Sequence, residues 1–371
     1  MYLTFFINKI NREPVYQDYS LDDFFNGKPI TAPTISKYTR TNFTRKTVIT
    51  QKPPSHHDQH IVNNALRKIY EIVDRHNPET VSSEYTTFFI PKRTGGQREI
   101  NAPTEGLMKD LRDIRDIFQY DLSILTHEAA HAYTEHRSTM TALQVHQKNH
   151  SRWFLKLDIK DFFPSCNEEF LTDMLEEIYP FATMSRAEIE AFIWIALKDN
   201  QLPQGTPLSP LLTNIVMTPI DYEIEKYCQK CKLIYTRYAD DILISGHESF
   251  NWQVVQATVM QIFNKMNAPF NIKPEKTRYG SSAGRNWNLG LMLNKDNNIT
   301  IGYRKKKRYK AALHNLMESY SKGFVYTKDE LYHFQGITSY YLSIEPEYIS
   351  NLISTYETKY NIYLKDLYKG L

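Results

Sequence analysis

The sequence has little cysteine, no long apolar run and almost no excess of charge. Its 371 residues include only three cysteines, which are too few for a disulfide framework. Cys228 and Cys231 form one Cys-x-x-Cys pair, and no second pair is present to complete a four-ligand zinc site. We therefore expect the cysteines to be reduced thiols.

The absence of long apolar runs argues against a membrane-spanning chain. No segment reaches the roughly 18 uninterrupted apolar residues that a membrane helix requires, and the N-terminus has no cleavable signal pattern. Hydrophobic residues make up 41% of the chain and charged residues 23%, which is typical of soluble globular proteins. We expect a cytoplasmic protein of two or three subdomains, with no membrane partner.

Charge is nearly balanced, and a net charge of +3 is small for a protein that binds nucleic acid. The distribution of the cations is more informative than their sum. Six of the seven residues from 304 to 310 are cationic, and they begin a helical pattern that continues through Leu313 and Leu316. Such a helix can lay its cations along a phosphate backbone. We predict nucleic-acid contacts at Arg304, Lys305, Lys306, Lys307, Arg308 and Lys310.

Two adjacent carboxylates, Asp240 and Asp241, stand between β-prone segments at 233–238 and 242–245. This pattern predicts a tight hairpin with the acidic pair at its tip. Side chains alternate along a strand, so the two aspartates cannot both enter a core, and an unpaired buried charge is costly. A solvated turn is the alternative for the pair taken alone. We expect a cation, or a strong set of donors, beside them.

A third carboxylate strengthens this expectation. Residues 153–158 alternate as a strand does, and the strand is predicted to end at Asp158 because Pro164 limits its continuation. An aspartate facing the acidic hairpin would add oxygen ligands, which Mg²⁺ prefers. Two such ions about 3.5–4 Å apart stabilise the attacking and leaving oxygens in phosphoryl transfer. The sequence therefore predicts a carboxylate site for phosphate chemistry.

A loop with three prolines and a glycine, residues 202–210, lies between the two acidic clusters and precedes a helical pattern at 211–224. A helix that starts after such a loop presents backbone donors to phosphates. In chain order, the aspartate strand, the Gln204-Gly205 loop and the Tyr-Ala-Asp-Asp hairpin resemble motifs A, B and C of reverse transcriptases. The resemblance is most specific to the bacterial branch, which holds group II intron, retron and defence-associated enzymes.

The resemblance extends to both sides of these motifs. Residues 90–103 resemble the fingers hairpin, whose cations close over the incoming triphosphate, and Lys92, Arg93 and Arg98 match those positions, with Arg98 the best match. Residues 272–277 resemble motif D, with Lys276 as a proton donor to the leaving pyrophosphate. Residues 288–291 resemble the hairpin that supports the primer end. Solvated surface cations are the alternative for Lys92 and Lys276.

The activity that the resemblance implies is RNA-directed DNA synthesis from dNTPs, on an RNA template with a DNA or RNA primer. Two Mg²⁺ ions are the implied cofactors. The implied metal ligands are Asp158, Ile159 through its backbone, Asp240 and Asp241, and the three aspartates are the implied catalytic residues. The implied nucleotide contacts are Lys92, Arg98, Asp161, Phe162, Phe163, Gln204, Gly205 and Lys276.

Phe163 matches the steric gate of the family, the side chain that excludes a ribose 2′-hydroxyl. A core phenylalanine is the alternative for Phe163, and it is the preferred interpretation of the Phe162 side chain. The backbone from Ile159 to Phe162 is expected to lie along the triphosphate.

The implied fold class is α+β, a right-hand polymerase fold with fingers, an antiparallel-sheet palm and a helical thumb. We expect an N-terminal accessory segment at 1–59, fingers at 60–150, a palm at 151–298 and a thumb with a C-terminal segment at 299–371. Helices are expected on one face of the palm sheet.

The subtype stays open at this stage. The chain leaves little room for a group II maturase region, and its length suits a retron enzyme. However, the retron Asn-Ala-x-x-His element is not matched, and Asn288-Leu289-Gly290 replaces Val-Thr-Gly. A cognate non-coding RNA or effector protein is therefore one expectation. A compact defence-associated polymerase with protein-primed or template-independent synthesis is the other.

A different class of enzyme is indicated by residues 127–131, which match the His-Glu-x-x-His pattern of zinc metalloproteases. That pattern requires a helix, so that His127 and His131 share one face, and a further ligand. The same stretch also fits a family segment, Ala-His-Ala-Tyr followed by Arg-Ser, at 130–133 and 137–138. The metalloprotease remains the alternative from another class.

Overall fold

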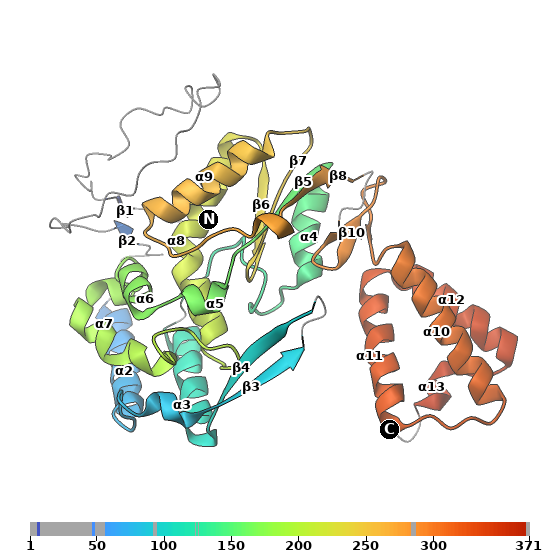
Figure 1. The fold of residues 1–371 in the computed structure, drawn as a ribbon, viewed down its shortest axis with the longest axis horizontal. Coiled ribbons are helices and arrows are strands. Elements are labelled where there is room, and N and C mark those ends of the chain that lie inside the picture. The colour runs from blue at the N-terminus through green and yellow to red at the C-terminus, as the bar shows by residue number, and fades with distance from the viewer. Residues whose placement is uncertain are drawn as a thin grey trace.

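Helices and short antiparallel sheets make up the part of the chain that the structure, a computed structural model, describes. The described residues are 6–7, 47–48, 56–91, 95–122, 124, 126–282 and 287–368. Figure 1 shows one large body of helices and strands, with the last helices of the chain standing beside it. This mixture of helices and antiparallel strands confirms the predicted α+β class.

The central sheet has four strands in the order β6-β7-β5-β8, and each neighbouring pair is antiparallel. Its strands are β5 (Trp153–Asp158), β6 (Ile234–Tyr238), β7 (Asp241–Gly246) and β8 (Arg278–Ser281). On one face, Leu155 and Leu157 of β5 lie beside Ile242 and Ile244 of β7 in the main core. Helices α8 (Ser209–Lys230) and α9 (Trp252–Lys265) cover this face (Figure 1).

The opposite face of the sheet is also partly covered, so the expectation of helices on one face only is wrong. Helix α4 (Thr139–Lys148) places His146 against this face, where its ring nitrogens contact the Ser245 and Thr236 hydroxyls at 2.6 and 2.8 Å. Burial lowers the pKa of His146 to about 3, so the ring is neutral. The helix covers the part of this face remote from Asp158, which lies on the same face by strand alternation.

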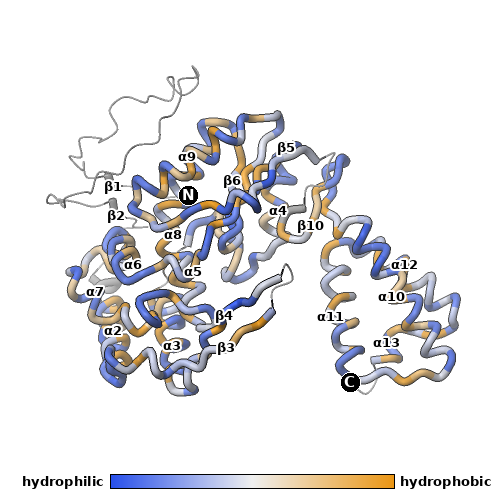
Figure 2. Tube along the Cα trace, in the orientation of Figure 1, coloured by the Kyte–Doolittle hydropathy of each residue, from blue (hydrophilic) through white to orange (hydrophobic). Residues whose placement is uncertain are grey.

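A hairpin and two main helices precede the central sheet. They are α2 (His56–Val73), η1 (Val81–Glu84), β3 (Tyr85–Pro91), β4 (Gln97–Pro103), α3 (Glu105–Asp116) and the π-helical turn η2 (Ile117–Asp121). His76 joins them, since its nitrogens lie 2.9 Å from Glu84 Oε1 and 2.8 Å from Asp110 Oδ2. The β3–β4 hairpin extends beyond the helices, and Figure 2 shows β3 as the more hydrophobic strand.

A second hydrophobic cluster holds the C-terminal helices together. A three-stranded sheet, β11-β10-β9, leads into it from β9 (Trp287–Asn288), β10 (Leu291–Leu293) and β11 (Ile299–Thr300). The helices are α10 (Tyr303–Ser321), α11 (Lys328–Ile344), α12 (Pro346–Tyr360) and α13 (Leu364–Leu367). A capping box between Thr327 and Glu330 starts α11, and Pro346 occupies the first turn of α12.

The remaining described elements are short. They are β1 (Phe6–Ile7), β2 (Thr47–Val48), α5 (Phe162–Ser165), α6 (Glu168–Leu175), η3 (Phe181–Thr183), α7 (Arg186–Ile193), η4 (Trp194–Ala196) and η5 (Pro274–Lys276). Helix α2 begins at His56, so the expected boundary at residue 60 falls inside a helix. The three cysteines are free thiols, as predicted. No described helix has the length and apolar character needed to cross a membrane.

Candidate active site

The central strands bring the three predicted catalytic aspartates to one edge of the sheet. Asp158, the last residue of β5, pairs directly with Asp241, the first residue of β7. Asp240 lies in the two-residue loop between β6 and β7, and its carbonyl oxygen accepts a hydrogen bond of 2.9 Å from the Ile159 N–H. The other loop residue, Ala239, has a left-handed φ of 55°, which turns the chain between the two strands.

Three lysines surround these carboxylates. Lys273 and Lys276 place their Nζ atoms 2.8 and 2.7 Å from the two oxygens of Asp158, which is only 3% exposed. Lys156 Nζ lies 2.9 Å from Asp241 Oδ2. Of the three lysines, only Lys276 was predicted to lie at the site. Lys156 could have been found, because residues two apart in a strand share a face and Asp158 lies two residues later.

Burial and mutual repulsion disfavour the ionised carboxylates. Desolvation raises the pKa of Asp240, and the charges of Asp241 and Asp158 add to that effect. Burial also raises the pKa of Asp241, although its ion pair with Lys156 acts in the opposite direction. The hydrogen bond to Asp158 raises the pKa of Lys276, so that this ammonium stays protonated at neutral pH. The ammonium groups of Lys156, Lys273 and Lys276 offset part of the cost of ionising the carboxylates, because they lie at ion-pair distance from Asp241 and Asp158.

The donor set suits a hard divalent cation, since every candidate ligand atom is an oxygen. Asp158 Oδ1 is buried and accepts no hydrogen bond, because Lys273 Nζ approaches it at ion-pair distance but outside hydrogen-bond geometry. The same ammonium also donates a long hydrogen bond of 3.4 Å to the Ile159 carbonyl oxygen. Among the described residues no group of three or more His, Cys, Asp or Glu side chains is arranged as a metal site, and the carboxylates of Asp158 and Asp241 pair with lysines.

The Gln204-Gly205 loop lies against the β3–β4 hairpin. The Asn101 N–H donates a hydrogen bond of 2.8 Å to the Gln204 carbonyl oxygen. Gly205 has φ +115°, and a Cβ at this position would lie 3.0 Å from the Asn101 carbonyl oxygen and from Ile100 Cγ2. Only glycine fits this close approach without strain. The loop thus joins the hairpin to the start of α8.

The turn after β5 carries three predicted nucleotide contacts. Asp161 is exposed and left-handed, with φ +45°. Phe162 is buried at 4% exposure, with its ring centroid 5.4 Å from that of Phe270, so its side chain belongs to the core and only its backbone can contact a nucleotide. Phe163 is half-buried at the edge of this core. The structure therefore separates the two phenylalanines, in agreement with the preferred interpretation of the Phe162 side chain as a core residue.

Cations of the hairpin and of α10 differ in accessibility. Arg98 is exposed on β4, while Lys92 lies outside the described residues. On α10, Lys305 Nζ donates to the Gly290 carbonyl oxygen at 2.6 Å, and Lys306 Nζ lies 2.5 Å from Glu345 Oε1. These contacts tie two of the six cations to neighbouring segments of the fold, and the expectation that all six contact nucleic acid stays a prediction.

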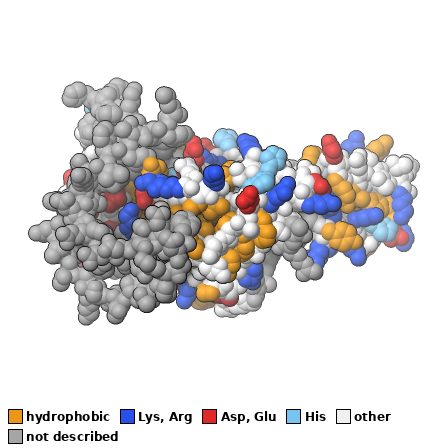
Figure 3. Space-filling model, turned by 90° about the horizontal axis from the view of Figure 1, so that it is seen from above, with side chains coloured by type: hydrophobic (Ala, Val, Ile, Leu, Met, Phe, Trp, Pro, Cys, Tyr) orange, Lys and Arg blue, Asp and Glu red, His pale blue; other side chains and the backbone are white. Residues whose placement is uncertain are grey.

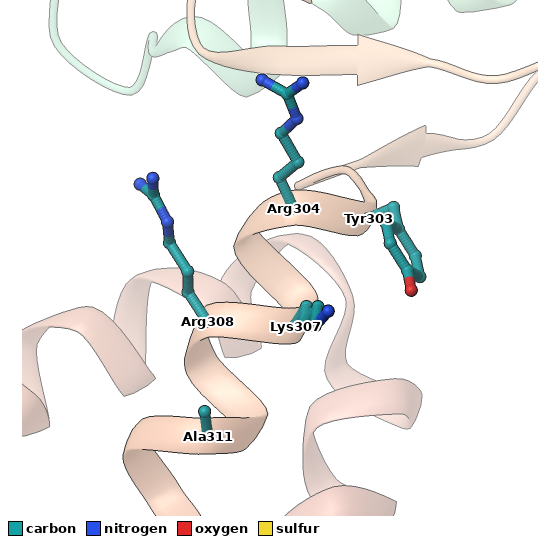
Figure 4. A pocket seen from close by; sticks show the side chains of 5 residues that line it. All are labelled: Tyr303, Arg304, Lys307, Arg308 and Ala311. Atoms are coloured by element: carbon teal, nitrogen blue, oxygen red, sulfur yellow. The ribbon is translucent and has the colours of Figure 1, made fainter.

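The other α10 cations remain on the surface. Arg304, Lys307, Arg308 and Lys310 are exposed, and the first three line a shallow depression together with Tyr303. Figure 4 shows the Arg304 and Arg308 guanidinium groups extending to the same side of the helix. Figure 3 shows further Lys and Arg side chains over the α10–α13 end of the molecule. This surface suits a phosphate backbone.

A buried polar network that was not predicted from the sequence supports the acidic turn. Arg237, which is 0% exposed, donates from Nε and Nη2 to the two oxygens of Asp221 at 2.8 and 2.7 Å. Its Nη1 donates to the Ala239 carbonyl oxygen and to Asn214 Oδ1, both at 3.2 Å. The Tyr235 hydroxyl donates to Asp221 at 2.6 Å. Residues two apart in a strand share a face, so Arg237 lies on the same buried face of β6 as Tyr235. A buried arginine requires a buried acid as its partner, and this requirement could have indicated the network from the sequence.

The zinc metalloprotease alternative fails on geometry. Residues 127–131 form a turn followed by a bridge to β6, so His127 and His131 do not share a helix face. His127 Nε2 lies 3.5 Å from Glu225 Oε2, and His131 Nδ1 lies 2.9 Å from the Thr141 hydroxyl. The stretch is a structural segment beside the acidic hairpin.

Comparisons with known proteins agree with the geometry. The model of the family described as reverse transcriptase (RNA-dependent DNA polymerase) matches residues 90–316. Retron Ec83 reverse transcriptase of Escherichia coli is 30% identical over 305 residues, which are 80% of this chain and 94% of that protein. Retron Ec73 reverse transcriptase, also of Escherichia coli, is 28% identical over 286 residues, or 72% and 85% of the two chains.

The solved structures that resemble the fold include apo telomerase from Candida tropicalis, at 13% identity and a TM-score of 0.44. This chain spans 59% of that telomerase, and the match covers 74% of this chain. The curated relatives also answer the question of subtype, since they carry retron names despite the two departures noted in the sequence. The chain therefore belongs to the reverse transcriptase family and is a retron-type RNA-directed DNA polymerase.

Proposed function

We propose that this polymerase joins nucleotides by two-metal-ion transfer at Asp158, Asp240 and Asp241, with Mg²⁺ as the metal. Family membership implies dependence on a divalent metal in general terms. The observation that carries the proposal is the direct pairing of Asp158 with Asp241, beside Asp240 and a buried oxygen that accepts no hydrogen bond. When bound, two Mg²⁺ ions would lower the pKa of the primer 3′-hydroxyl and neutralise charge on the triphosphate.

The protein contributes positioning and charge around this centre. Asp158, Asp240, Asp241 and the Ile159 carbonyl would hold the metals. Lys276 is 49% exposed at its side chain, so its Nζ is able to leave Asp158 and donate a proton to the pyrophosphate. While Lys276 pairs with Asp158, that hydrogen bond raises its pKa, so the side chain enters the reaction as a protonated ammonium.

Other residues would hold the nucleotide in place. Arg98 would clamp phosphate oxygens as a planar, bidentate donor, and Lys92 would assist it. The backbone from Ile159 to Phe162, with Asp161 at the turn, would follow the triphosphate, and Phe163 would exclude a 2′-hydroxyl. Gln204 and Gly205 would contact the nascent pair, and the hydrogen bond from Asn101 to Gln204 supports their coupling to the hairpin.

The partners follow from the same proposal. An RNA template, a DNA or RNA primer and dNTPs would occupy the space between the hairpin, the acidic edge and α10, within fingers (60–150), palm (151–298) and thumb (299–371). Arg304, Lys307, Arg308 and Lys310 would neutralise backbone phosphates. We also propose a cognate non-coding RNA, an effector protein and a cytoplasmic role in antiphage defence. Residues 1–59 would serve as an accessory segment.

A primer-extension assay tests the metal site. The chain is given a primed RNA template, dNTPs and Mg²⁺, and product is measured for the wild type and for Asp240→Asn/Asp241→Asn. We expect extension to fall to background in the double variant. Asp296→Asn, an exposed aspartate in the β10–β11 loop, is the matched control and should retain activity. Equal extension by wild type and the double variant would refute the assignment.

Two further arms address template and partner. Omitting the RNA template should abolish product, whereas template-independent synthesis would persist without it. Sequencing the nucleic acid that co-purifies with the protein should return one structured RNA with attached or extended DNA. Recovery of only heterogeneous cellular RNA would contradict a cognate partner.

A further inference from the structure

The ring of Phe163 contacts two other aromatic rings. Phe162 contacts it edge-on, with centroids 5.6 Å apart and planes at 71°. Phe162 is itself fixed in the core beside Phe270. Tyr133 contacts Phe163 in the same edge-on manner, with centroids 6.2 Å apart and planes at 71°. Phe163 therefore packs against one ring of the core and against one ring of a distant segment of the chain.

The backbone of that segment is held in an unusual conformation. Tyr133 has φ +58°, in the left-handed region that costs a non-glycine residue on the order of 1–2 kcal/mol. Hydrogen bonds on the preceding residues maintain it. The His131 N–H donates to the Arg237 carbonyl oxygen at 2.8 Å, and Asn214 Nδ2 donates to the Ala132 carbonyl oxygen at 2.7 Å. The segment is thus tied to β6 and α8, the two elements that carry the acidic turn and the Gln204 loop.

Stability of the core does not account for this arrangement. The Tyr133 side chain is 53% exposed, so its burial contributes little compared with a core aromatic. Burial raises the pKa of the Tyr133 hydroxyl, and the hydroxyl is close enough to the active site for the charge of Asp240 to raise this pKa further and that of Arg98 to lower it. Strained backbone and an exposed ring at a site point to a functional constraint.

We propose that Tyr133 is a positioning residue that braces the Phe163 ring and thereby sets discrimination between deoxyribonucleotides and ribonucleotides. This inference rests on the proposed role of Phe163 as the steric gate. With both neighbours in place, the Phe163 ring cannot turn away from the sugar. Without Tyr133, one side of the ring faces solvent, and the ring is able to rotate and admit a 2′-hydroxyl.

The experiment compares kcat/KM for dGTP and GTP on a primed RNA template. The variants are Tyr133→Ala, Tyr133→Phe, Phe163→Ala and the double variant Tyr133→Ala/Phe163→Ala. Edge-to-face ring pairs correspond to roughly two- to tenfold in an equilibrium, so we expect Tyr133→Ala to lower dGTP preference by about that factor. Tyr133→Phe keeps the ring and should retain the wild-type preference. In Tyr133→Ala, the loss of preference for dGTP should come from a lower KM for GTP, while kcat for dGTP stays within about twofold of wild type.

The double variant separates bracing from a direct role. If Tyr133 acts through Phe163, adding Tyr133→Ala to Phe163→Ala should change the preference no further. Additive effects would overturn the proposal. Tyr363→Ala removes an equally exposed tyrosine beside α13, and it should leave the preference unchanged. Failure of the proposed gate and failure of the proposed brace give different results. An unchanged preference for dGTP over GTP in Phe163→Ala refutes the role of Phe163 as the gate. A changed preference in Phe163→Ala with none in Tyr133→Ala refutes only the brace.

Discussion

The buried ion pair between Arg237 and Asp221 allows the sharpest test of how the acidic turn is supported. Both side chains are fully buried, and two hydrogen bonds of 2.8 and 2.7 Å join them. We consider Arg237→Met, which has similar length but no charge. This change leaves the Asp221 carboxylate with the Tyr235 hydroxyl as its remaining donor in this network. It also removes the donor to the Ala239 carbonyl oxygen, in the loop that carries Asp240.

The expected cost is large because a carboxylate would stay buried without a counter-charge. Breaking such a pair by removing one partner costs about 3–5 kcal/mol, against a total stability of about 5–15 kcal/mol for a typical domain. Replacing both partners by apolar residues removes the unpaired charge as well. The double variant Arg237→Met/Asp221→Leu should therefore lose less stability than Arg237→Met alone.

Urea unfolding followed by tryptophan fluorescence measures these differences, since Trp153 lies in the central sheet, stacked on Tyr279. The control is Glu71→Gln, which breaks the exposed pair between Arg67 and Glu71, with side chains 68% and 56% exposed. That pair should contribute less than about 0.5 kcal/mol. If Arg237→Met lowers the free energy of unfolding by less than about 1 kcal/mol, the ion pair does not support the fold as argued. The same conclusion follows if Arg237→Met/Asp221→Leu is less stable than Arg237→Met.

Three more variants test other parts of the molecule. Burial lowers the pKa of His76, but hydrogen bonds to its two carboxylate partners outweigh this and raise it. Its contribution to stability should therefore be full below about pH 6.5 and lost as pH rises through the raised pKa, so the difference in unfolding free energy from His76→Gln should shrink between pH 6 and 9. Gly205→Ala should raise KM for dNTPs, because φ +115° and a 3.0 Å contact force the loop to shift; an unchanged KM contradicts this. Lys156→Met removes a counter-charge, so thermal unfolding should show a lower Tm without Mg²⁺ and a larger gain on adding it; a gain equal to wild type contradicts the ion-pair role.

Strand alternation and the order of the acidic motifs predicted much of the site. Asp158 ends β5 and Asp241 begins β7, close to where the pattern placed them. The expected helix after Gln204-Gly205 runs from Ser209 to Lys230, two residues beyond the start and six beyond the end of its apolar pattern. These features are local, since a strand or hairpin is specified by neighbours in sequence.

Contacts between distant segments could not be read in the same way. Nothing in the sequence indicates that Lys273 would reach Asp158, because the two residues are 115 positions apart and meet through tertiary contacts: the Lys273 N–H donates to the Asp158 carbonyl oxygen at 2.9 Å, and Ile272 forms a bridge with Ile159. The inward turn of Lys306 depends on Glu345, at the end of α11. Helix α4 packs on the face of the central sheet opposite α8 and α9, where the His146 ring contacts the hydroxyls of Ser245 on β7 and Thr236 on β6. Such pairings are decided by tertiary packing, which a charge pattern does not encode.

The three lysines give a physical reason why the acidic edge can fold before any substrate arrives. Carboxylates this close repel each other, and burial adds to the cost of ionising them. Lys156, Lys273 and Lys276 offset that cost, but they differ in freedom, with side chains 25%, 20% and 49% exposed. Lys156 sits inside a central strand, whereas Lys276 ends a single 3₁₀ turn. A metal ion that competes for the Asp158 oxygens should therefore displace Lys276 first and leave Lys156 beside Asp241. For this reason, Lys156→Met tests how far a lysine stabilises the carboxylates when no metal is bound.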